Sequence, residues 1–266
     1  MKRVHLFEFT DMTWYPQVFR GIQTDYLQFV ATLNKSHKNL IPLFQRALEN
    51  SKVKQIVDLC SGGTGSWENL QEQLKQGGIE VKIKLTDKYP NLGAIQKVNK
   101  KSGQEIEYLS ESVDATDVPT NLKGMRTLFE GFHHFKPEQA KNILKDAVDK
   151  REAIGIFEAS LKPPFGLLVL LLSPIMTIVS YILMTPFIKP RTISRFVWTY
   201  FIPIVPLATC WDGIVSLLRV YSEQELKKLT QSISAEDYVW EIGQASTGTP
   251  IFVNSYLVGY PKNEDQ

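Results

Sequence analysis

Glycines and acidic residues follow apolar runs at several points of this 266-residue chain, in spacings that suit a nucleotide-like ligand. In residues 54–65, KQIVDLCSGGTG, an apolar run ends in Asp58 and the glycine turn Gly62–Gly65 follows. Glycines allow a tight turn and leave no Cβ in the way of a ligand that approaches the backbone N–H groups. A strand, this turn and a helix over Trp67–Gln76 would place bare backbone beside a nucleoside.

A second acid ends the next apolar run, at Asp87 in KLTDKYP, and Lys88 follows it directly. Asp87 lies 22 residues after Gly65, the spacing at which a carboxylate reaches a ribose over the glycine turn. The alternative is an aspartate that only caps a helix or forms a turn, because Asp-Lys-Tyr-Pro also has turn composition. Together with the glycine turn, the position favours ribose binding.

Asp114 and Ala115 follow a third β-like segment, in SVDATDVP. A carboxylate here could accept a hydrogen bond from an adenine amino group while the backbone of Ala115 approaches the ring. An ordinary surface turn that ends at Pro119 is the alternative. Under the binding hypothesis, three successive strand ends contact one nucleoside.

Glu130 ends a fourth apolar run, and His133 and His134 lie in the loop after it, in RTLFEGFHHFKPEQA. Residues just past the carboxyl ends of parallel strands face the ligand crevice of such a sheet. A histidine there could act as a general base or orient a substrate, and the alternative is one that caps the next helix or packs. Two histidines without nearby Cys or His partners make a poor metal site, so we predict no metal.

β-like and helical runs alternate between residues 53 and 160, as is typical of βαβ units in a parallel, doubly wound α/β sheet. We expect strands at Lys54–Cys60, Val81–Asp87, Glu105–Val113, Arg126–Glu130 and Ala153–Glu158. We expect helices at Trp67–Gln76, Leu92–Ser102 and Pro137–Asp149. The pattern returns after residue 220 with a helix around Ser222–Ser232 and a closing antiparallel hairpin of strands near Tyr238–Gly243 and Phe252–Gly259.

These features, in this order, resemble class I S-adenosylmethionine-dependent methyltransferases over about residues 53–160 and again over 222–260. The chain is also similar to uncharacterised bacterial methyltransferase-like proteins with an N-terminal Trp-Tyr/Phe-Pro and a later Trp-Asp-Gly. The resemblance implies a Rossmann-like, mostly parallel, seven-stranded sheet and S-adenosylmethionine as cofactor. It implies that the cofactor-binding residues are Asp58, Cys60, Ser61, Gly62, Gly63, Gly65, Asp87, Lys88, Asp114, Ala115 and Glu130.

The glycine turn departs from the family pattern. The usual turn is Asp-x-Gly-x-Gly-x-Gly, whereas this chain has Asp58-Leu-Cys-Ser-Gly-Gly-Thr-Gly, one residue longer and with Cys60 where the first glycine is expected. The fourth strand also lacks the Asn-Pro-Pro-Tyr signature of enzymes that methylate amino groups of DNA and protein. It is more similar to small-molecule enzymes with a His-His pair in this loop.

Two charge-free runs, Gly166–Ile188 and Phe196–Trp211, interrupt the α/β pattern. A basic cluster separates them: Lys189, Arg191 and Arg195. The first run is long enough to cross a bilayer core, but prolines and hydroxyl residues dilute it, and a single crossing would divide a sheet that resumes after residue 220. We favour an amphipathic or re-entrant cap over residues 166–211 that touches a membrane or covers an apolar pocket. An internal helical lid and a two-span hairpin stay open.

Composition narrows the class of protein further. A net charge of +2 argues against a nucleic-acid partner. Cys60 and Cys210 lie far apart, form no metal spacing and fit a reducing compartment. The N-terminal segment lacks the apolar region of a secretory signal. We therefore expect a cytoplasmic protein, either free or peripheral at the inner face of the membrane, whose oligomeric state the sequence does not indicate.

We expect three parts: an N-terminal helical segment (1–52), an S-adenosylmethionine-binding α/β domain (53–160 and 221–266) and an apolar helical insertion (161–220). The expected reaction is methyl transfer to a small, lipophilic or membrane-resident acceptor, with His133, His134 or Asp212 as the base. Asp212 is a candidate because an acid at an apolar edge can have a raised pKa, although Asp-Gly is also a common turn pair. A non-catalytic, membrane-associated binding protein on this scaffold is one alternative. A nicotinamide-dependent oxidoreductase is less favoured, because residues 60–65 lack Gly-x-Gly-x-x-Gly.

Overall fold

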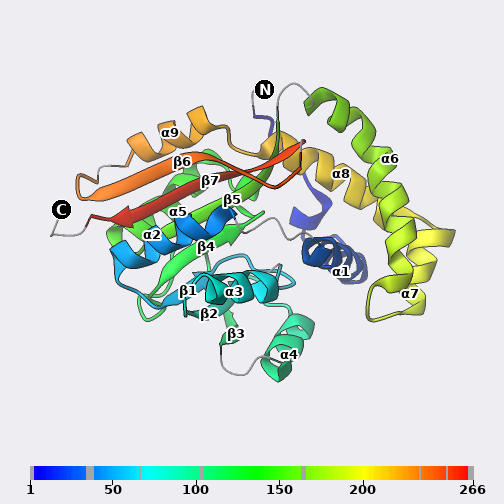
Figure 1. Cartoon of the computed structure of the whole chain (residues 1–266). Helices are drawn as coiled ribbons and strands as arrows, with labels where there is room; N and C mark the ends of the chain where they lie inside the picture. The colour runs from blue at the N-terminus through cyan, green and yellow to red at the C-terminus, as the bar shows by residue number, and fades with distance from the viewer. Residues whose placement is uncertain are drawn as a thin grey trace.

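A computed structural model describes residues 3–33, 39–65, 67–101, 105–162, 166–233, 235–249 and 251–262. Its centre is a seven-stranded sheet in the spatial order β3-β2-β1-β4-β5-β7-β6 (Figure 1). The strands are β1 (Gln55–Asp58), β2 (Lys82–Asp87), β3 (Ile106–Ser112), β4 (Met125–Phe129), β5 (Ile154–Leu161), β6 (Tyr238–Ser246) and β7 (Phe252–Pro261).

The first five strands pair in parallel, and β7 runs antiparallel between β5 and β6. The chain order reverses at β1, which pairs with β2 on one side and β4 on the other. Ligands of open α/β sheets bind at the carboxyl ends of the strands beside such a switch point. The predicted doubly wound, mostly parallel sheet and its closing antiparallel hairpin are therefore confirmed.

Helices cover both faces of the sheet (Figure 1). Ile56 and Val57, neighbours on β1, are both fully buried but belong to apolar clusters on opposite faces, because successive side chains of a strand alternate. A strand buried on both faces has the near-continuous apolar sequence seen here. The helices are α2 (Ile41–Ser51), α3 (Trp67–Gln76) and α4 (Leu92–Lys101) on one face, and α5 (Pro137–Asp149) and α9 (Glu223–Gln231) on the other.

Helix α1 (Gln17–Leu33) packs against the helices of the insertion (Figure 1). A third apolar cluster joins Ile22 and Tyr26 of α1 to Tyr181 and Val205, and the rings of Tyr26 and Tyr181 stack with centroids 4.0 Å apart. The insertion consists of α6 (Gly166–Met184), η4 (Thr185–Phe187), α7 (Ile193–Phe196), the π-helical turn η5 (Val197–Phe201) and α8 (Ile204–Arg219).

The predicted elements lie within a few residues of the observed ones. Helices α3 and α5 have the predicted bounds, and α4 ends at Lys101, with the predicted last residue, Ser102, outside the described residues. Strand β5 continues past Glu158 to Leu161 because β7 pairs along its full length. The division of the chain into three parts stays a prediction.

One residue of the basic cluster does not lie at the surface. Arg195 is buried, and its guanidinium forms an ion pair with Asp25 of α1. Lys189 and Arg191 are exposed. Two of the three basic residues therefore remain at the surface.

Candidate cofactor site

The turn after β1 contains several left-handed residues. Gly62 and Gly65 have φ of 52° and 54°, a conformation that costs glycine little. No described atom lies within 4 Å of a Cβ built on either residue, so the turn borders open space at both. Cys60, where the family has glycine, is also left-handed, with φ of 59°.

Asp58 lies beneath this turn and supports it. Its side chain is buried, Oδ1 accepts a hydrogen bond from Thr127 Oγ1 (2.7 Å), and Oδ2 accepts one from Ser61 Oγ (2.6 Å). Burial raises the pKa of Asp58 to about 7. Direct cofactor contact was predicted for Asp58 and Ser61. The structure instead directs both side chains toward the sheet, because each is engaged there.

Asp87 joins the end of β2 to the glycine turn. Its Oδ2 accepts a hydrogen bond from the Gly62 N–H (2.9 Å), and its Oδ1 accepts one from the Tyr89 N–H (2.8 Å). Each carboxylate oxygen has a further lone pair, so Asp87 can still accept from a diol. The Val113 N–H donates to the Asp87 carbonyl (3.0 Å), which places the end of β3 beside this acid.

Asp114 lies at that next strand end and is fixed by its neighbours. Its Oδ2 forms an ion pair with Lys88 Nζ (2.7 Å), and its Oδ1 accepts hydrogen bonds from the N–H and Oγ1 of Thr116. These hydrogen bonds lower the pKa of Asp114 to about 2. Ala115 as a whole is only 4% exposed, so its backbone has little open surface for the predicted approach to a ligand. Lys88 thus orients the third acid.

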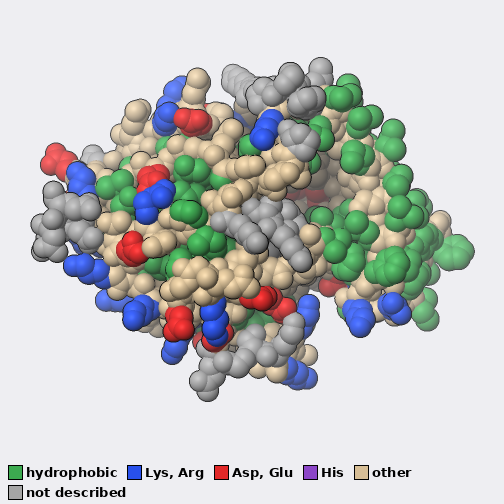
Figure 2. Space-filling view, viewed as in Figure 1, with side chains coloured by type: hydrophobic (Ala, Val, Ile, Leu, Met, Phe, Trp, Pro, Cys, Tyr) green, Lys and Arg blue, Asp and Glu red, His purple; other side chains and the backbone are tan. Residues whose placement is uncertain are grey.

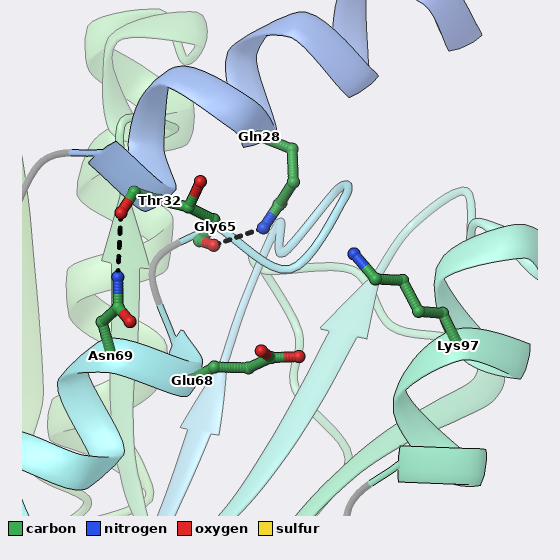
Figure 3. Close-up of a pocket in the computed structure, with 6 residues that line it drawn as sticks. All are labelled: Gln28, Thr32, Gly65, Glu68, Asn69 and Lys97. Carbon is green, nitrogen blue, oxygen red and sulfur yellow. Dashed lines mark hydrogen bonds between the residues drawn. The ribbon is translucent and has the colours of Figure 1, made fainter. Parts of the chain in front are cut away.

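Helix α1 lies directly on the glycine turn. A Cβ on Gly63 would meet Thr24 Cγ2 at 2.9 Å and Gln28 Oε1 at 3.2 Å, so glycine permits the close approach of the helix. Gln28 Nε2 donates to the Gly65 carbonyl (2.6 Å), as Figure 3 shows. The small pocket beside this contact is lined by Gln28, Thr32, Gly65, Glu68, Asn69 and Lys97 (Figure 3).

Glu130 follows β4 in the middle of the sheet edge. Its side chain is exposed at the end of the strand. Figure 2 shows a hollow between the sheet and the insertion. Glu130 Oε1 accepts a hydrogen bond from the Ala159 N–H (2.8 Å). Desolvation by the neighbouring protein and, second, the negative charge of Glu158 raise the pKa of Glu130 to about 8. A carboxyl that titrates near neutral pH can act as a general base.

His133, in η3 (Phe132–His134), is buried against Glu158 of β5. Its Nδ1 lies 2.6 Å from Glu158 Oε2, and Glu158 Oε1 accepts from the N–H groups of Phe132 (2.6 Å) and His133 (3.2 Å). Burial lowers the pKa of His133, but the Glu158 carboxylate outweighs this and raises it. Glu158 therefore fixes both the ring and the backbone of this loop.

The N-terminal segment covers both histidines. Glu8 is buried, and its Oε1 lies 3.9 Å from His133 Nε2 and 3.0 Å from Arg219 Nη1. His134 Nδ1 lies 2.9 Å from Oδ1 of Asp11, in η1 (Phe9–Asp11), which also pairs with Arg219 (2.7 Å). Ligand-type atoms of Glu8, His133 and His134 lie within 4.8 Å of one another. The Arg219 guanidinium supplies the positive charge of this cluster.

Asp212 anchors the N-terminal segment. It is buried in α8, and its carboxylate accepts hydrogen bonds from the N–H groups of Phe9 (2.7 Å) and Thr10 (3.2 Å) and from Gln23 Nε2 (2.9 Å). The predicted base role does not fit, because both oxygens are engaged away from the sheet edge. We correct it to a positioning role.

Sequence reasoning missed the partners of the histidines. The sequence did mark Glu158 as unusual, because it is an acid within the otherwise apolar run IGIFEASL and would need a buried partner. Glu8, Asp11 and Arg219 carried no such signal, because their contact with the loop joins segments that are more than 80 residues apart.

Comparison with solved structures gives the fold a family context. Human N-acetylserotonin methyltransferase, solved in complex with S-adenosylmethionine, matches 92% of this chain and 57% of its own chain, with 12% identity and a TM-score of 0.50. This chain has the fold of class I S-adenosylmethionine-dependent methyltransferases.

LepI in complex with S-adenosylmethionine is 15% identical, over 82% of this chain and 46% of its own, with a TM-score of 0.46. Magnesium protoporphyrin IX methyltransferase from Synechocystis PCC 6803 is 9% identical, over 85% and 80%, with a TM-score of 0.43. The chain spans about half the length of the solved structures it matches first. No family model matches the sequence, and no curated protein matches it.

Proposed function

We propose that the protein binds S-adenosylmethionine at the carboxyl ends of β1, β2 and β3 and transfers its methyl group to a small, lipophilic acceptor. The arrangement of Asp87 carries this proposal, because it reaches from β2 to an open glycine turn with Asp114 at the adjacent strand end. The neighbour solved with this cofactor, human N-acetylserotonin methyltransferase, supports the choice of ligand.

The residues at this edge fit an adenosyl sulfonium. The open space beside Gly62 and Gly65 would receive the ligand against bare backbone. Asp87 would accept hydrogen bonds from the ribose, and Asp114, ionised at neutral pH, would accept one from the adenine amino group. When bound, the sulfonium supplies an electrophilic methyl group.

The protein's main task in such a displacement is to align acceptor and methyl group. Where the acceptor must lose a proton, we assign the base to Glu130. It is exposed at the end of β4, its pKa of about 8 suits proton transfer, and its Oε2 accepts no hydrogen bond from the described residues. His133 is buried beneath Glu8, and His134 is engaged with Asp11.

The hollow supports a lipophilic acceptor. Apolar side chains of the insertion stand beside it (Figure 2). Phe19 of α1 and Trp198 of η5 pack with ring centroids 4.9 Å apart, so aromatic side chains join the helix over the glycine turn to the insertion. Apolar walls with a few polar groups are the usual lining of a small-molecule site.

Isothermal titration with S-adenosylhomocysteine tests the cofactor assignment. We expect saturable heat at micromolar ligand and none with NADH, which would bind instead if the protein were an oxidoreductase. Absence of heat at high micromolar S-adenosylhomocysteine would refute the proposal.

Transfer itself is tested with methyl-labelled S-adenosylmethionine and a lipid extract, with label counted in the organic phase. Glu130→Gln should keep S-adenosylhomocysteine affinity and lower transfer by about 10²-fold or more for an acceptor that must lose a proton. Binding without transfer to any acceptor would favour the non-catalytic binding protein.

A further inference from the structure

The outward side of helix α6 is apolar. Leu168–Phe187 has a mean hydropathy of 2.2, yet only 11% of it is buried inside the molecule. Its exposed large apolar residues recur at one-, three- and four-residue spacing and form one broad stripe along the helix: Leu168, Leu171, Leu172, Ile175, Met176, Val179, Ile182 and Leu183. A water-facing helix normally carries polar residues on this side.

The inward side of the same helix carries its polar groups. Ser180 Oγ and Tyr26 OH lie 2.9 Å apart, and Tyr181 OH donates to the Ile22 carbonyl (3.2 Å). Thr185 is fully buried, and its Oγ1 donates to the Tyr181 carbonyl (2.7 Å). The helix therefore turns its polar side chains toward the protein and its apolar side chains outward, which fits surroundings less polar than water.

The apolar surface continues past α6 to a basic rim. Phe187, Ile193 and Phe201 are each at least 65% exposed, and Lys189 and Arg191 stand exposed between them. Figure 2 shows this apolar surface over α6 and its neighbours, with Lys and Arg side chains at its lower edge. The sequence holds no acidic residue between Glu158 and Asp212. The charged residues that the insertion contributes to this surface are therefore all cationic, and Asp25 of α1 lies beside it in its ion pair with Arg195.

We propose that this surface, the exposed side of α6 with η4, α7 and η5, docks onto an anionic lipid bilayer. The insertion follows β5 and is followed by α9, and both of these elements belong to the α/β domain. The chain therefore begins and ends its insertion on the protein side of the proposed membrane surface. The helix then lies in the interface with its stripe among the acyl chains, and Lys189 and Arg191 contact anionic headgroups.

The charge pattern favours lipid over a second copy of the chain. Protein interfaces mix apolar and polar area and pair charges of both signs. The exposed charges that the insertion places on this rim, Lys189 and Arg191, are both positive, which complements an anionic membrane and would repel the same rim of a partner copy. Docking does not depend on the proposed function, although it would place the hollow near lipophilic molecules.

Vesicle flotation tests the proposal with the full chain in the absence of detergent. We expect the protein to float with vesicles of phosphatidylcholine and phosphatidylglycerol, and less with phosphatidylcholine alone. Ile175→Glu/Ile182→Glu should lower the bound fraction about tenfold or more, because two charges would enter the acyl region. Lys189→Ala/Arg191→Ala should remove the preference for anionic vesicles, a loss of about tenfold.

Lys228→Glu, on exposed α9, changes the net charge by the same two units as either double variant and should float like the wild type. Failure of the wild type to bind either vesicle, or full binding by Ile175→Glu/Ile182→Glu, would overturn the proposal. So would a wild-type dimer that this variant makes monomeric without any vesicle binding, because a second copy would then cover the surface. Unchanged S-adenosylhomocysteine affinity in the variant shows that it is folded and separates this result from the cofactor assignment.

Discussion

The two halves of the strand-end edge are held together in different ways. At β1–β3 the polar groups pair with residues of the neighbouring turns, as Asp87 does with Gly62 and Asp114 with Lys88. At β4–β5, His133 likewise pairs with Glu158 of the neighbouring strand, but remote residues also surround this loop, as Glu8 pairs with Arg219 and Asp11 with His134. The first half is partly open and can take a ligand, whereas in the second the N-terminal segment covers His133 while Glu130 stays exposed. We infer that the β1–β3 end serves cofactor binding and that Glu158 and the N-terminal segment serve mainly to hold the loop after β4.

The largest effect should come from the β4–β5 half. Glu158→Ala removes the acceptor of three buried donors, and we expect a loss of about 3–5 kcal/mol in the free energy of unfolding, measured with urea. Glu107→Ala, an exposed acid on β3, is the matched control and should change little. A loss as small as that of the control would show that the two halves do not differ in this way.

The raised pKa of Asp58 should make the free energy of unfolding depend on pH. Its pKa is about 7 in the folded protein and ordinarily 3.8, so the folded state keeps a proton that the unfolded state releases between these values. Stability from this group is therefore highest below pH 4 and falls by about 1.4 kcal/mol per pH unit up to about pH 7. Asp58→Asn should lose this slope, as measured by urea unfolding at several pH values. Parallel curves for the two proteins would contradict the assignment.

Ligand affinity should depend on the open half. Asp87→Ala should weaken S-adenosylhomocysteine binding about tenfold or more, because the ribose loses a charged acceptor. Glu111→Ala, an exposed acid on β3, serves as the control for calorimetry. Equal affinities for both variants would remove the ribose assignment and leave Asp87 with a purely structural role.

The smallest effect should come from Lys88. Its ion pair with Asp114 is exposed, and such pairs contribute little. We expect Lys88→Ala to change S-adenosylhomocysteine affinity by less than about threefold and to leave the urea midpoint nearly unchanged. A drop as large as that of Asp87→Ala would mean that Lys88 contacts the ligand itself.

The features predicted correctly from the sequence lie mainly at the β1–β3 end, and those that were missed lie at the β4–β5 end and in the segments that cover it. Strand β1 and helix α3 were predicted because apolar spacing and a glycine turn are local signals. Asp87 and Asp114 could be located because Asp87 is the last residue of β2 and Asp114 lies two residues past β3. Asp212 was misassigned because an aspartate before glycine has the same sequence appearance whether it forms a turn, caps a segment or titrates. Its actual partners, Phe9 and Gln23, are about 190 residues or more away.

The sequence by itself determined the succession of strands along the chain, the glycine turn and the acids at the ends of β1, β2 and β3. Backbone geometry ties these features to residue spacing within short segments. Only the tertiary structure decided that α1 lies on Gly63, that Glu8 covers His133 and that α6 turns its apolar stripe outward. Each of these depends on which distant surfaces meet. Tertiary packing determines which distant surfaces contact one another, and no local sequence pattern predicts it.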